Sequence, residues 1–168
     1  MSEPASKSPF WQFSIKFYAV PGVADACIAL QDQAKVDVNI LFYLLWNATE
    51  GRTFNAADVA EIERRIGPWR DMAVVPIRNI RRALKAPPPV IEPAAAEGLR
   101  SRIKAVELEA ERLQQEALYG LAQTSRLGRP SPSKADAAND SISSYQGVIG
   151  PFPPEPLDTL LSAFAKFG

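Results

Sequence analysis

The chain has 168 residues, of which 46% are hydrophobic and 23% are charged, and its 19 basic and 19 acidic residues cancel to a formal net charge of zero. This length and composition are typical of one globular domain, and zero net charge excludes a global field that would draw the chain to nucleic acid or an anionic membrane. Cys27 is the only cysteine and histidine is absent, which excludes an intramolecular disulfide, histidine-based catalysis and most zinc and iron sites.

The N-terminal part of the sequence predicts a loose terminus over residues 1–7, followed by a first helix. Ser8 and Pro9 suit the N-cap and the first position of that helix. Its aromatic residues recur at helical spacing over a wide arc, which is typical of a largely buried helix. We expect the helix to end at Pro21.

Two further helices follow closely. We expect the second over residues 23–34, where apolar residues line one face. Asp37 is placed to cap a third helix over residues 38–49. Every residue from 40 to 46 is apolar or aromatic, so this helix has no polar face there. We predict that it is the buried central helix of the fold.

The clearest helix boundary in the sequence is at Asn55. Asn55 suits an N-cap, and Asp58 stands three residues later in a capping-box arrangement. We expect this fourth helix to end at Gly67 and the next helix to open at Pro68. That next segment keeps one helical phase across Pro76, which predicts either one kinked helix or two short helices in line.

A proline-rich stretch over residues 87–93 predicts a stiff connector, and a sixth helix is expected over 97–122. Apolar residues of this helix alternate four and three positions apart, as in a coiled-coil seam. They are Leu99, Ile103, Val106, Ala110, Leu113 and Ala117. Because the pattern spans only about three heptads, we expect it to pack on its own domain rather than to form a long dimer.

The last part of the chain divides by composition. Residues 123–154 are rich in Ser, Pro, Asp and Asn, which predicts a flexible linker. Residues 155–168 resume helical spacing and predict an amphipathic helix. Its apolar anchors are Leu157, Leu160, Leu161 and Phe164. Such a tethered helix could dock on the same chain or on another protein, and its spacing alone does not choose between the two.

The predicted fold class is therefore all-α. We expect a compact bundle of about six helices over residues 8–122, arranged around the central helix, with the tethered C-terminal helix as an addition.

The block FWxFSxxFYxxPGVxxACxxLQDxxxVDVNxLxxxLW, which begins at Phe10, resembles a family of small proteobacterial proteins catalogued as a domain of unknown function. The resemblance also takes in Trp69 and the segments PIRNIRRALK and LRSRIKAVELEAERLQ, so it covers residues 9–120. It implies a helical architecture and a bacterial, cytoplasmic setting. It implies no activity, cofactor or catalytic residue.

The clearest candidate for a binding surface is a basic stretch over residues 52–85, whose eight basic and four acidic residues give a net charge of +4. Arg78, Arg82 and Lys85 share one helical face that could grip an acidic partner. The alternative, which we favour, is that acidic residues of the sixth helix such as Glu107 pair with them within the chain. We do not expect nucleic acid here, because no aromatic reader lies among the basic residues and no helix-turn-helix signature is present.

A second candidate site combines polar residues of the second and third helices, Gln31, Asp32 and Asn39, with the aromatic residues Trp11 and Trp46. These groups could line a pocket for a ligand. We favour the alternative that the polar residues serve as caps and as a structural hydrogen-bond network, and that the aromatic residues form a packed core.

The leading functional hypothesis is a non-enzymatic interaction or adaptor module, cytoplasmic, that binds an unknown protein partner through the basic face and the C-terminal helix. The first alternative is a small protein that binds an apolar ligand or lipid in a cavity of roughly a few hundred Å³ between the first and third helices. The second is an enzyme with a carboxylate base at Asp32 or Asp37. We predict no cofactor and no metal site, and we predict no membrane span, because the longest apolar stretch is far too short to cross a bilayer.

Overall fold

The computed structural model describes residues 7–168, so the loose terminus expected over residues 1–7 lies almost wholly outside the described residues. The described chain is mostly helical, with one two-stranded sheet of four residues, which confirms the predicted all-α class. In chain order the elements are α1 (Pro9–Tyr18), α2 (Val23–Ala34), α3 (Val38–Thr49), β1 (Arg52–Thr53), α4 (Ala56–Trp69), the π-helix η1 (Arg70–Val74), α5 (Val75–Ala83), α6 (Pro93–Thr124), β2 (Arg129–Pro130), α7 (Lys134–Ile149) and α8 (Pro154–Lys166).

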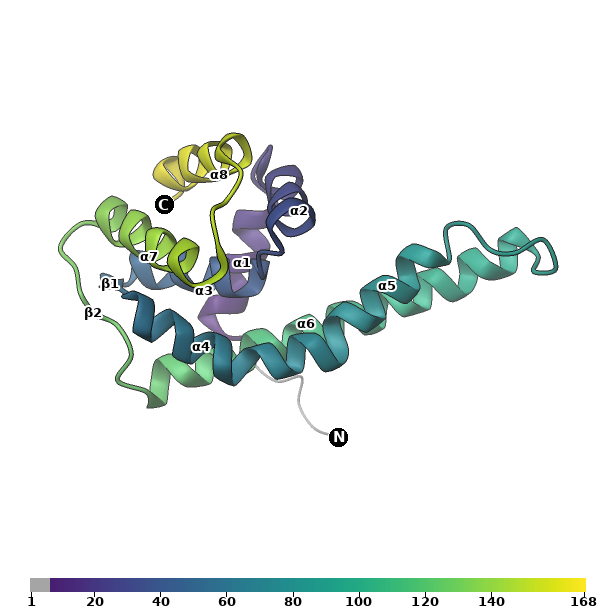
Figure 1. Cartoon of the computed structure of the whole chain (residues 1–168), viewed down its shortest axis with the longest axis horizontal. Coiled ribbons are helices and arrows are strands. Elements are labelled where there is room, and N and C mark those ends of the chain that lie inside the picture. Colours follow the sequence, from purple (N-terminus) through teal and green to yellow (C-terminus); the bar gives the residue numbers. More distant parts are fainter. Residues whose placement is uncertain (1–6) are drawn as a thin grey trace.

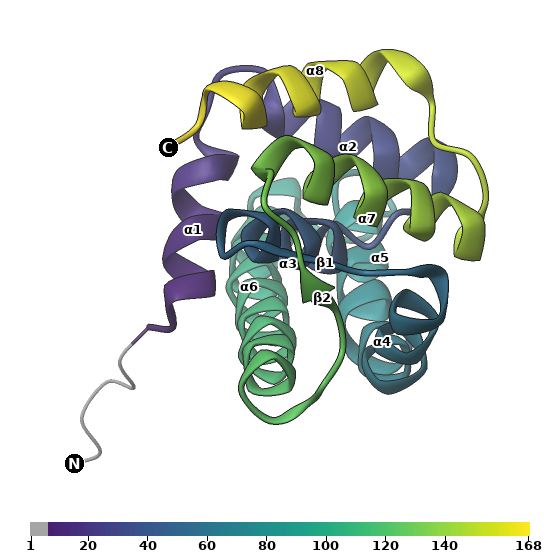
Figure 2. The ribbon, with the colours of Figure 1, turned by 90° about the vertical axis from the view of Figure 1, so that its left-hand side faces the viewer.

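The helices form a rounded body and a projecting arm (Figure 1). In the body, α1, α2, α4, α7, α8 and the second half of α6 surround α3 (Figure 2), and β1 and β2 form a two-stranded antiparallel sheet at the end of the body away from the arm (Figure 1). α5 and the first half of α6 run side by side away from the body, joined by the proline-rich connector. We call residues 78–104 the arm. The expected bundle is therefore present, but part of two helices lies outside it.

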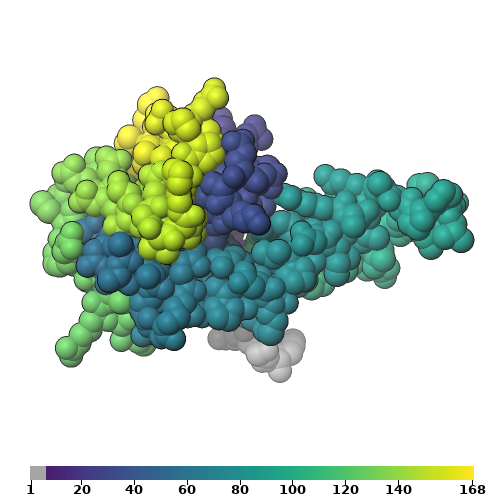
Figure 3. All heavy atoms as spheres, viewed as in Figure 1, coloured from purple at the N-terminus to yellow at the C-terminus, as the bar shows by residue number. Residues whose placement is uncertain are grey.

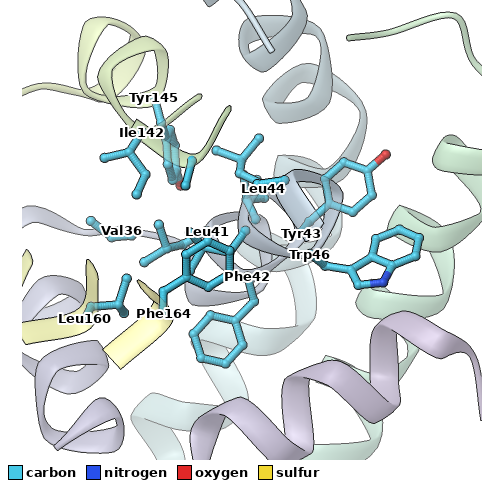
Figure 4. Close-up of a cluster of buried hydrophobic side chains, with 14 of the residues drawn as sticks. Val36, Leu41, Phe42, Tyr43, Leu44, Trp46, Ile142, Tyr145, Leu160 and Phe164 are labelled. Atoms are coloured by element: carbon cyan, nitrogen blue, oxygen red, sulfur yellow. The ribbon is translucent and has the colours of Figure 1, made fainter. Parts of the chain in front are cut away.

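The central position predicted for α3 is confirmed. All residues from Ile40 to Ala48 are buried, and side chains from α7 and α8 close over them (Figure 4). Ile142 and Tyr145 contribute from α7, and Phe164 contributes from α8. Burial of this much apolar surface is the main source of stability for the body.

The predicted starts of α1, α3 and α4 are also confirmed, whereas α6 begins at Pro93 and not at residue 97. Ser8 Oγ accepts the backbone N–H of Trp11 at 3.1 Å, and the Asp37 side chain accepts two backbone N–H groups of α3. Asn55 and Asp58 form the expected capping box. Each cap satisfies donors that the first turn of a helix cannot pair internally, which is why short polar residues at these positions locate the helices so well.

The segment around Pro76 differs from expectation. Neither Gly67 nor Pro68 ends α4, which continues to Trp69 and passes directly into η1 and then α5. Pro76 has no N–H, and its ring would clash with the carbonyl four residues earlier in a regular helix. A π-helical turn just before the proline, in which the N–H of Val75 reaches the carbonyl of Arg70, relieves this conflict without breaking the helix.

The prediction of a flexible linker over 123–154 is wrong for residues 134–149, which form α7. Ser133 caps this helix by accepting the N–H of Asp136 at 3.1 Å. Its small residues Ala137, Ala138 and Ser141 are buried. A polar, small-residue composition suggested disorder, but small side chains also let a helix approach its neighbours closely, and α7 uses them to pack on α3 and α4.

α8 docks on its own chain, against α2 and α1. This is one of the two arrangements that the sequence left open.

Among residues 7–168, no single helix is long and apolar enough to cross a membrane. α1 and α2 reach such a length and composition only as a pair, and a bend of 99° separates them.

Candidate functional site

A network of polar side chains surrounds Asp37, the residue that caps α3. One carboxylate oxygen accepts the backbone N–H groups of Asn39 and Ile40 at 3.0 and 3.3 Å. The other accepts Gln114 Nε2 from α6 at 2.7 Å and Arg70 from η1 at 3.3 Å. Burial raises the pKa of this carboxyl, against the lowering effect of Arg70 and Gln114. Because all its lone-pair directions meet donors, Asp37 is a cap and a network centre rather than a free catalytic base.

Tyr145 from α7 completes this network. Its hydroxyl accepts the backbone N–H of Asp37 at 3.0 Å and donates to Glu63 Oε1 of α4 at 3.1 Å. Glu63 Oε2 in turn lies 2.9 Å from Arg70. Burial, together with the nearby carboxylates of Asp37 and Glu63, raises the pKa of Tyr145. Elements α3, α4, η1, α6 and α7 thus meet at one buried polar centre.

Three side-chain amides continue from Asp37 in series. Gln114 donates to Asp37, as described, and its Oε1 accepts Asn39 Nδ2 at 3.3 Å. Asn39 Oδ1 accepts Gln115 Nε2 at 2.9 Å. An ionised carboxylate only accepts hydrogen bonds, so Asp37 fixes the orientation of each amide that follows. The last acceptor in the series is Gln115 Oε1, which therefore points away from the network.

A cleft of about 990 Å³ opens beside these residues. α1 and α2 form one wall, η1, α5 and α6 form the other, and the start of α3 forms the floor. In the space-filling view it lies in the notch between α2 and the arm (Figure 3). Four large apolar side chains on its walls are 45% to 54% exposed. They are Ile15, Tyr18, Ile28 and Leu108.

Three buried polar atoms on the walls of this cleft have no hydrogen-bond partner among residues 7–168. They are Trp11 Nε1, Ser14 Oγ and Gln115 Oε1. The three residues are 7%, 5% and 5% exposed. Buried polar groups in folded proteins are almost always paired, so the gathering of unpaired ones in one cleft distinguishes this place from the rest of the interior.

The structure brings together most of the predicted polar site. Gln31, Asp32, Asn39 and Trp11 all line the cleft. Trp46 does not, because it packs in the core, with its ring 5.5 Å from that of Phe10 and 5.7 Å from that of Tyr119. Asn39 also belongs to a structural network, as the favoured interpretation held.

Two arginines of α5 reach acidic residues of α6 at the arm side of the cleft. Arg78 lies 3.0 Å from Glu107 and 2.8 Å from Glu111, and Arg81 also pairs with Glu107. Burial alone would raise the pKa of Glu107, but hydrogen bonds from Arg81 and Arg78 lower it below its ordinary value. For Glu111 burial prevails and raises the pKa. The favoured interpretation, pairing within the chain, is confirmed for Arg78.

The other two residues of the predicted basic face differ from Arg78. Arg82 reaches across the cleft mouth to Asp32 of α2 at 3.0 Å, and both side chains are more than 40% exposed. Lys85 is exposed and forms no ion pair with any residue between 7 and 168. An exposed pair such as Arg82 and Asp32 contributes little to stability, so this face remains partly available to other molecules.

α6 carries an exposed apolar surface that the sequence did not predict. Of the expected coiled-coil seam, Ala110 is buried, but Leu99, Val106 and Leu113 are 41%, 51% and 43% exposed. These three residues stand seven positions apart and form one line along α6, which we call the α6 stripe. The expectation that the whole seam packs on its own domain is wrong for the stripe, because α5 covers only the neighbouring face.

The four anchors of the C-terminal helix lie at the core. Leu160 and Phe164 are buried, and Leu157 and Leu161 are partly buried. The Phe164 ring lies 5.9 Å from that of Phe17 in α1. Their predicted contact with a partner protein stays a prediction, since in the docked position they are used by the chain itself.

Sequence reasoning missed several residues of this site. Gln114 and Gln115 are polar residues beside a predicted apolar seam, and that conflict was a usable signal. Ser14 lies within the wide apolar arc of the first helix and carried a weaker signal. Arg70 was one of the basic residues of the stretch 52–85, with nothing to single it out, and Tyr145 lay in a predicted linker.

Cys27 also lines the cleft but is not a nucleophile. It is 1% exposed, and burial raises the pKa of its thiol to about 12. The thiol is therefore protonated at neutral pH, and a thiol attacks only as the thiolate.

Comparison with known proteins adds a family without a described activity. The family described as "Protein of unknown function (DUF2390)" matches residues 9–118. That range includes α1 to α5 and most of α6, and therefore the cleft walls and the α6 stripe. No curated protein and no solved structure matches the chain.

Proposed function

The chain belongs to the DUF2390 family of proteins of unknown function, and we propose that it is a non-enzymatic interaction module that binds a helix of a partner protein along α6. The observation that carries this proposal is the α6 stripe, Leu99, Val106 and Leu113. Three large apolar side chains at heptad spacing are the pattern by which one helix recognises another. Here no helix among residues 7–168 covers them.

Charge along the same side of α6 specifies the partner further. Arg102, Glu109 and Glu116 stand three positions after the three stripe residues, at the same seven-residue spacing. This second row along α6 is basic near the arm tip and acidic near the body. A partner helix that pairs with this row carries acidic residues at its arm-tip end and basic residues at the other. Such pairs choose the partner and its direction more than they add affinity.

The arm reinforces the basic end. Residues 78–104 contain seven basic and two acidic residues, a net charge of +5, and the rest of the chain therefore carries −5. Lys85, Arg102 and Lys104 form no ion pair within residues 7–168. Arg78, Arg81 and Arg82 pair with carboxylates outside this range, so the three unpaired cations are the ones that raise the association rate of an acidic partner and make that rate fall with added salt. Lys85, part of the predicted basic face, belongs to this surface.

The absence of a catalytic arrangement in the described residues is consistent with this proposal. Asp37 is fully engaged as a cap, Asp32 pairs with Arg82, and the Cys27 thiol is protonated at neutral pH. The predicted interaction surface therefore moves from the C-terminal helix, which docks on its own body, to the stripe and the arm.

The test is quantitative capture of proteins from cells of the source organism on the immobilised full-length protein and on two variants. Val106→Glu places a charge in the middle of the stripe. Met72→Glu is the matched control, because Met72 is 71% exposed and lies in η1 rather than on α6. We expect a partner that is retained by the wild type and by Met72→Glu and lost with Val106→Glu.

Two results would overturn the proposal. Retention of the same proteins by all three forms would show that the stripe is not the interface. Concentration-dependent self-association that Val106→Glu abolishes, with no other protein retained, would show that the stripe joins two copies of this chain and is not an adaptor surface.

A further inference from the structure

The cleft has a hydrogen-bonding requirement that the interaction module does not use. Trp11 Nε1 is a donor without an acceptor, and Gln115 Oε1 is an acceptor without a donor, within residues 7–168. Ser14 Oγ, which can donate and accept, is the third unpaired atom among the residues that line the cleft. A molecule that fits here offers an acceptor to the indole and a donor to the amide oxygen.

The requirement at Gln115 is fixed by the fold. Because Asp37 only accepts, Gln114 donates to it, Asn39 donates to Gln114, and Gln115 donates to Asn39. Rotating the Gln115 amide would place its oxygen against Asn39 Oδ1, and two acceptors would then face each other. The network therefore leaves Gln115, a residue of the cleft wall, with an unpaired and buried carbonyl oxygen rather than an unpaired N–H group.

The surroundings favour an uncharged molecule. Three of the four cationic residues that line the cleft, Arg70, Arg78 and Arg82, pair with carboxylates. An anion that binds to one of these arginines competes with its carboxylate, whereas an uncharged polar group leaves the pairs intact. The fourth, Lys35, is exposed and forms no ion pair within residues 7–168, so an anion is the alternative that the surroundings leave open.

The walls also accommodate an apolar portion. Ile15, Tyr18, Ile28 and Leu108 are about half exposed on the cleft, and Trp11 and Ser14 lie deeper on the same helix as Ile15 and Tyr18. Small-molecule sites combine apolar walls with a few fixed polar groups in this way, and a volume of about 990 Å³ is at the upper end of their usual range.

We propose that this cleft binds a small uncharged organic molecule through a group in which an N–H donor adjoins a carbonyl acceptor, as in a lactam or a primary carboxamide. The carbonyl accepts from Trp11 Nε1, the N–H donates to Gln115 Oε1, and the remaining apolar part lies against the cleft walls. Binding of this kind is separate from the α6 stripe, which faces away from these residues along α6.

The test follows the indole N–H signals of the full-length protein by ¹H–¹⁵N NMR. The probe is 2-pyrrolidinone, a lactam, and the matched control is N-methyl-2-pyrrolidinone, which keeps the carbonyl but lacks the N–H. Trp69 provides an internal reference, because its Nε1 already donates to the carbonyl of Ala110 at 2.9 Å. We expect a saturable shift of the Trp11 signal with the lactam and at least tenfold weaker binding of the N-methyl compound.

A substitution at Gln115 tests whether this residue is the one that distinguishes the lactam from its N-methyl derivative. Gln115→Met keeps a side chain of similar length and removes the acceptor, so the two probes should bind this variant within about twofold of each other. An unchanged Trp69 signal shows that the variant is folded.

The outcomes that overturn the proposal do not depend on that variant. Equal binding of both probes to the wild type would show that Gln115 does not accept from a ligand. Absence of any saturable shift at Trp11 would show that the cleft polar groups are met by water alone, which buried polar sites commonly hold.

Discussion

Tyr145 and Asp37 lie 108 positions apart in the sequence, yet the Tyr145 hydroxyl accepts the backbone N–H of Asp37 at 3.0 Å. The same hydroxyl donates to Glu63, so it connects α7 to the caps and ion pairs that hold α3, α4 and η1. This contact makes α7 part of the body and fixes the start of α3, on which the floor of the cleft depends.

Tyr145→Phe should therefore destabilise the protein by about 1–3 kcal/mol, because it leaves the buried N–H of Asp37 without a partner. Denaturation by urea, followed by circular dichroism, measures the change. Tyr119→Phe is the control, since the Tyr119 hydroxyl forms no hydrogen bond with residues 7–168. Equal stability of the two variants would show that the contact contributes nothing.

Docking of α8 should contribute strongly to stability. Phe164 is 2% exposed and packs against the aromatic rings of Phe13 and Phe17, so Phe164→Ala should cost about 3–5 kcal/mol. The exposed neighbour Lys166 serves as a control, and Lys166→Ala should change the free energy of unfolding by less than about 0.5 kcal/mol. A loss below about 1 kcal/mol for Phe164→Ala would mean that α8 is not held on the body.

The ion pairs of Glu107 with Arg78 and Arg81 of the arm should stabilise the protein less at acid pH than at neutral pH. Hydrogen bonds from Arg81 and Arg78 lower the pKa of Glu107 in the folded protein, so its contribution is present above about pH 4.5 and is lost as the pH falls through the lowered value. Glu107→Gln should lower the free energy of unfolding by about 1–3 kcal/mol at neutral pH and by less near pH 3.

The control for that prediction is Glu109→Gln, since Glu109 is 57% exposed and, within residues 7–168, pairs only with its helical neighbour Arg112. Chemical denaturation at both pH values gives the comparison. A deficit of Glu107→Gln that does not shrink in acid would refute the role given to ionised Glu107.

At alkaline pH the thiol of Cys27 should reduce stability. Burial raises its pKa from 9.0 to about 12, so the unfolded chain loses this proton first. Stability is then complete below about pH 9 and falls as the pH rises toward 12, by up to about 1.4 kcal/mol per pH unit for one proton. Cys27→Ala should show a correspondingly flatter decline of the unfolding free energy over that range, and an unchanged slope would contradict the assignment.

The parts of the fold that the sequence predicted are those set by local chemistry. Ser8, Asp37 and Asn55 begin helices because their side chains pair the first backbone N–H groups, and the unbroken apolar run of α3 marks it as central. α7 was missed because its helix is stabilised by packing and by one long-range contact at Tyr145, neither of which is visible in local composition.

The site was predicted only in part for the same reason. Gln31, Asp32 and Asn39 stand near one another in sequence, and α2 and α3 carry them to the cleft together. Gln115 and Arg70 arrive from helices far along the chain. The exposed α6 stripe depends on which face α5 covers, and a heptad pattern alone does not contain that choice.

A photoreactive amino acid placed at Val106 of the full-length protein in the source cells tests whether the α6 stripe binds a partner, and the same substitution at Met72 is the control. We predict that irradiation joins position 106 to a different protein through one helix, with acidic residues toward the arm tip, and that position 72 gives no such product. Cross-links at position 106 only to this same chain, or identical products from both positions, would contradict the proposal that the α6 stripe binds a partner.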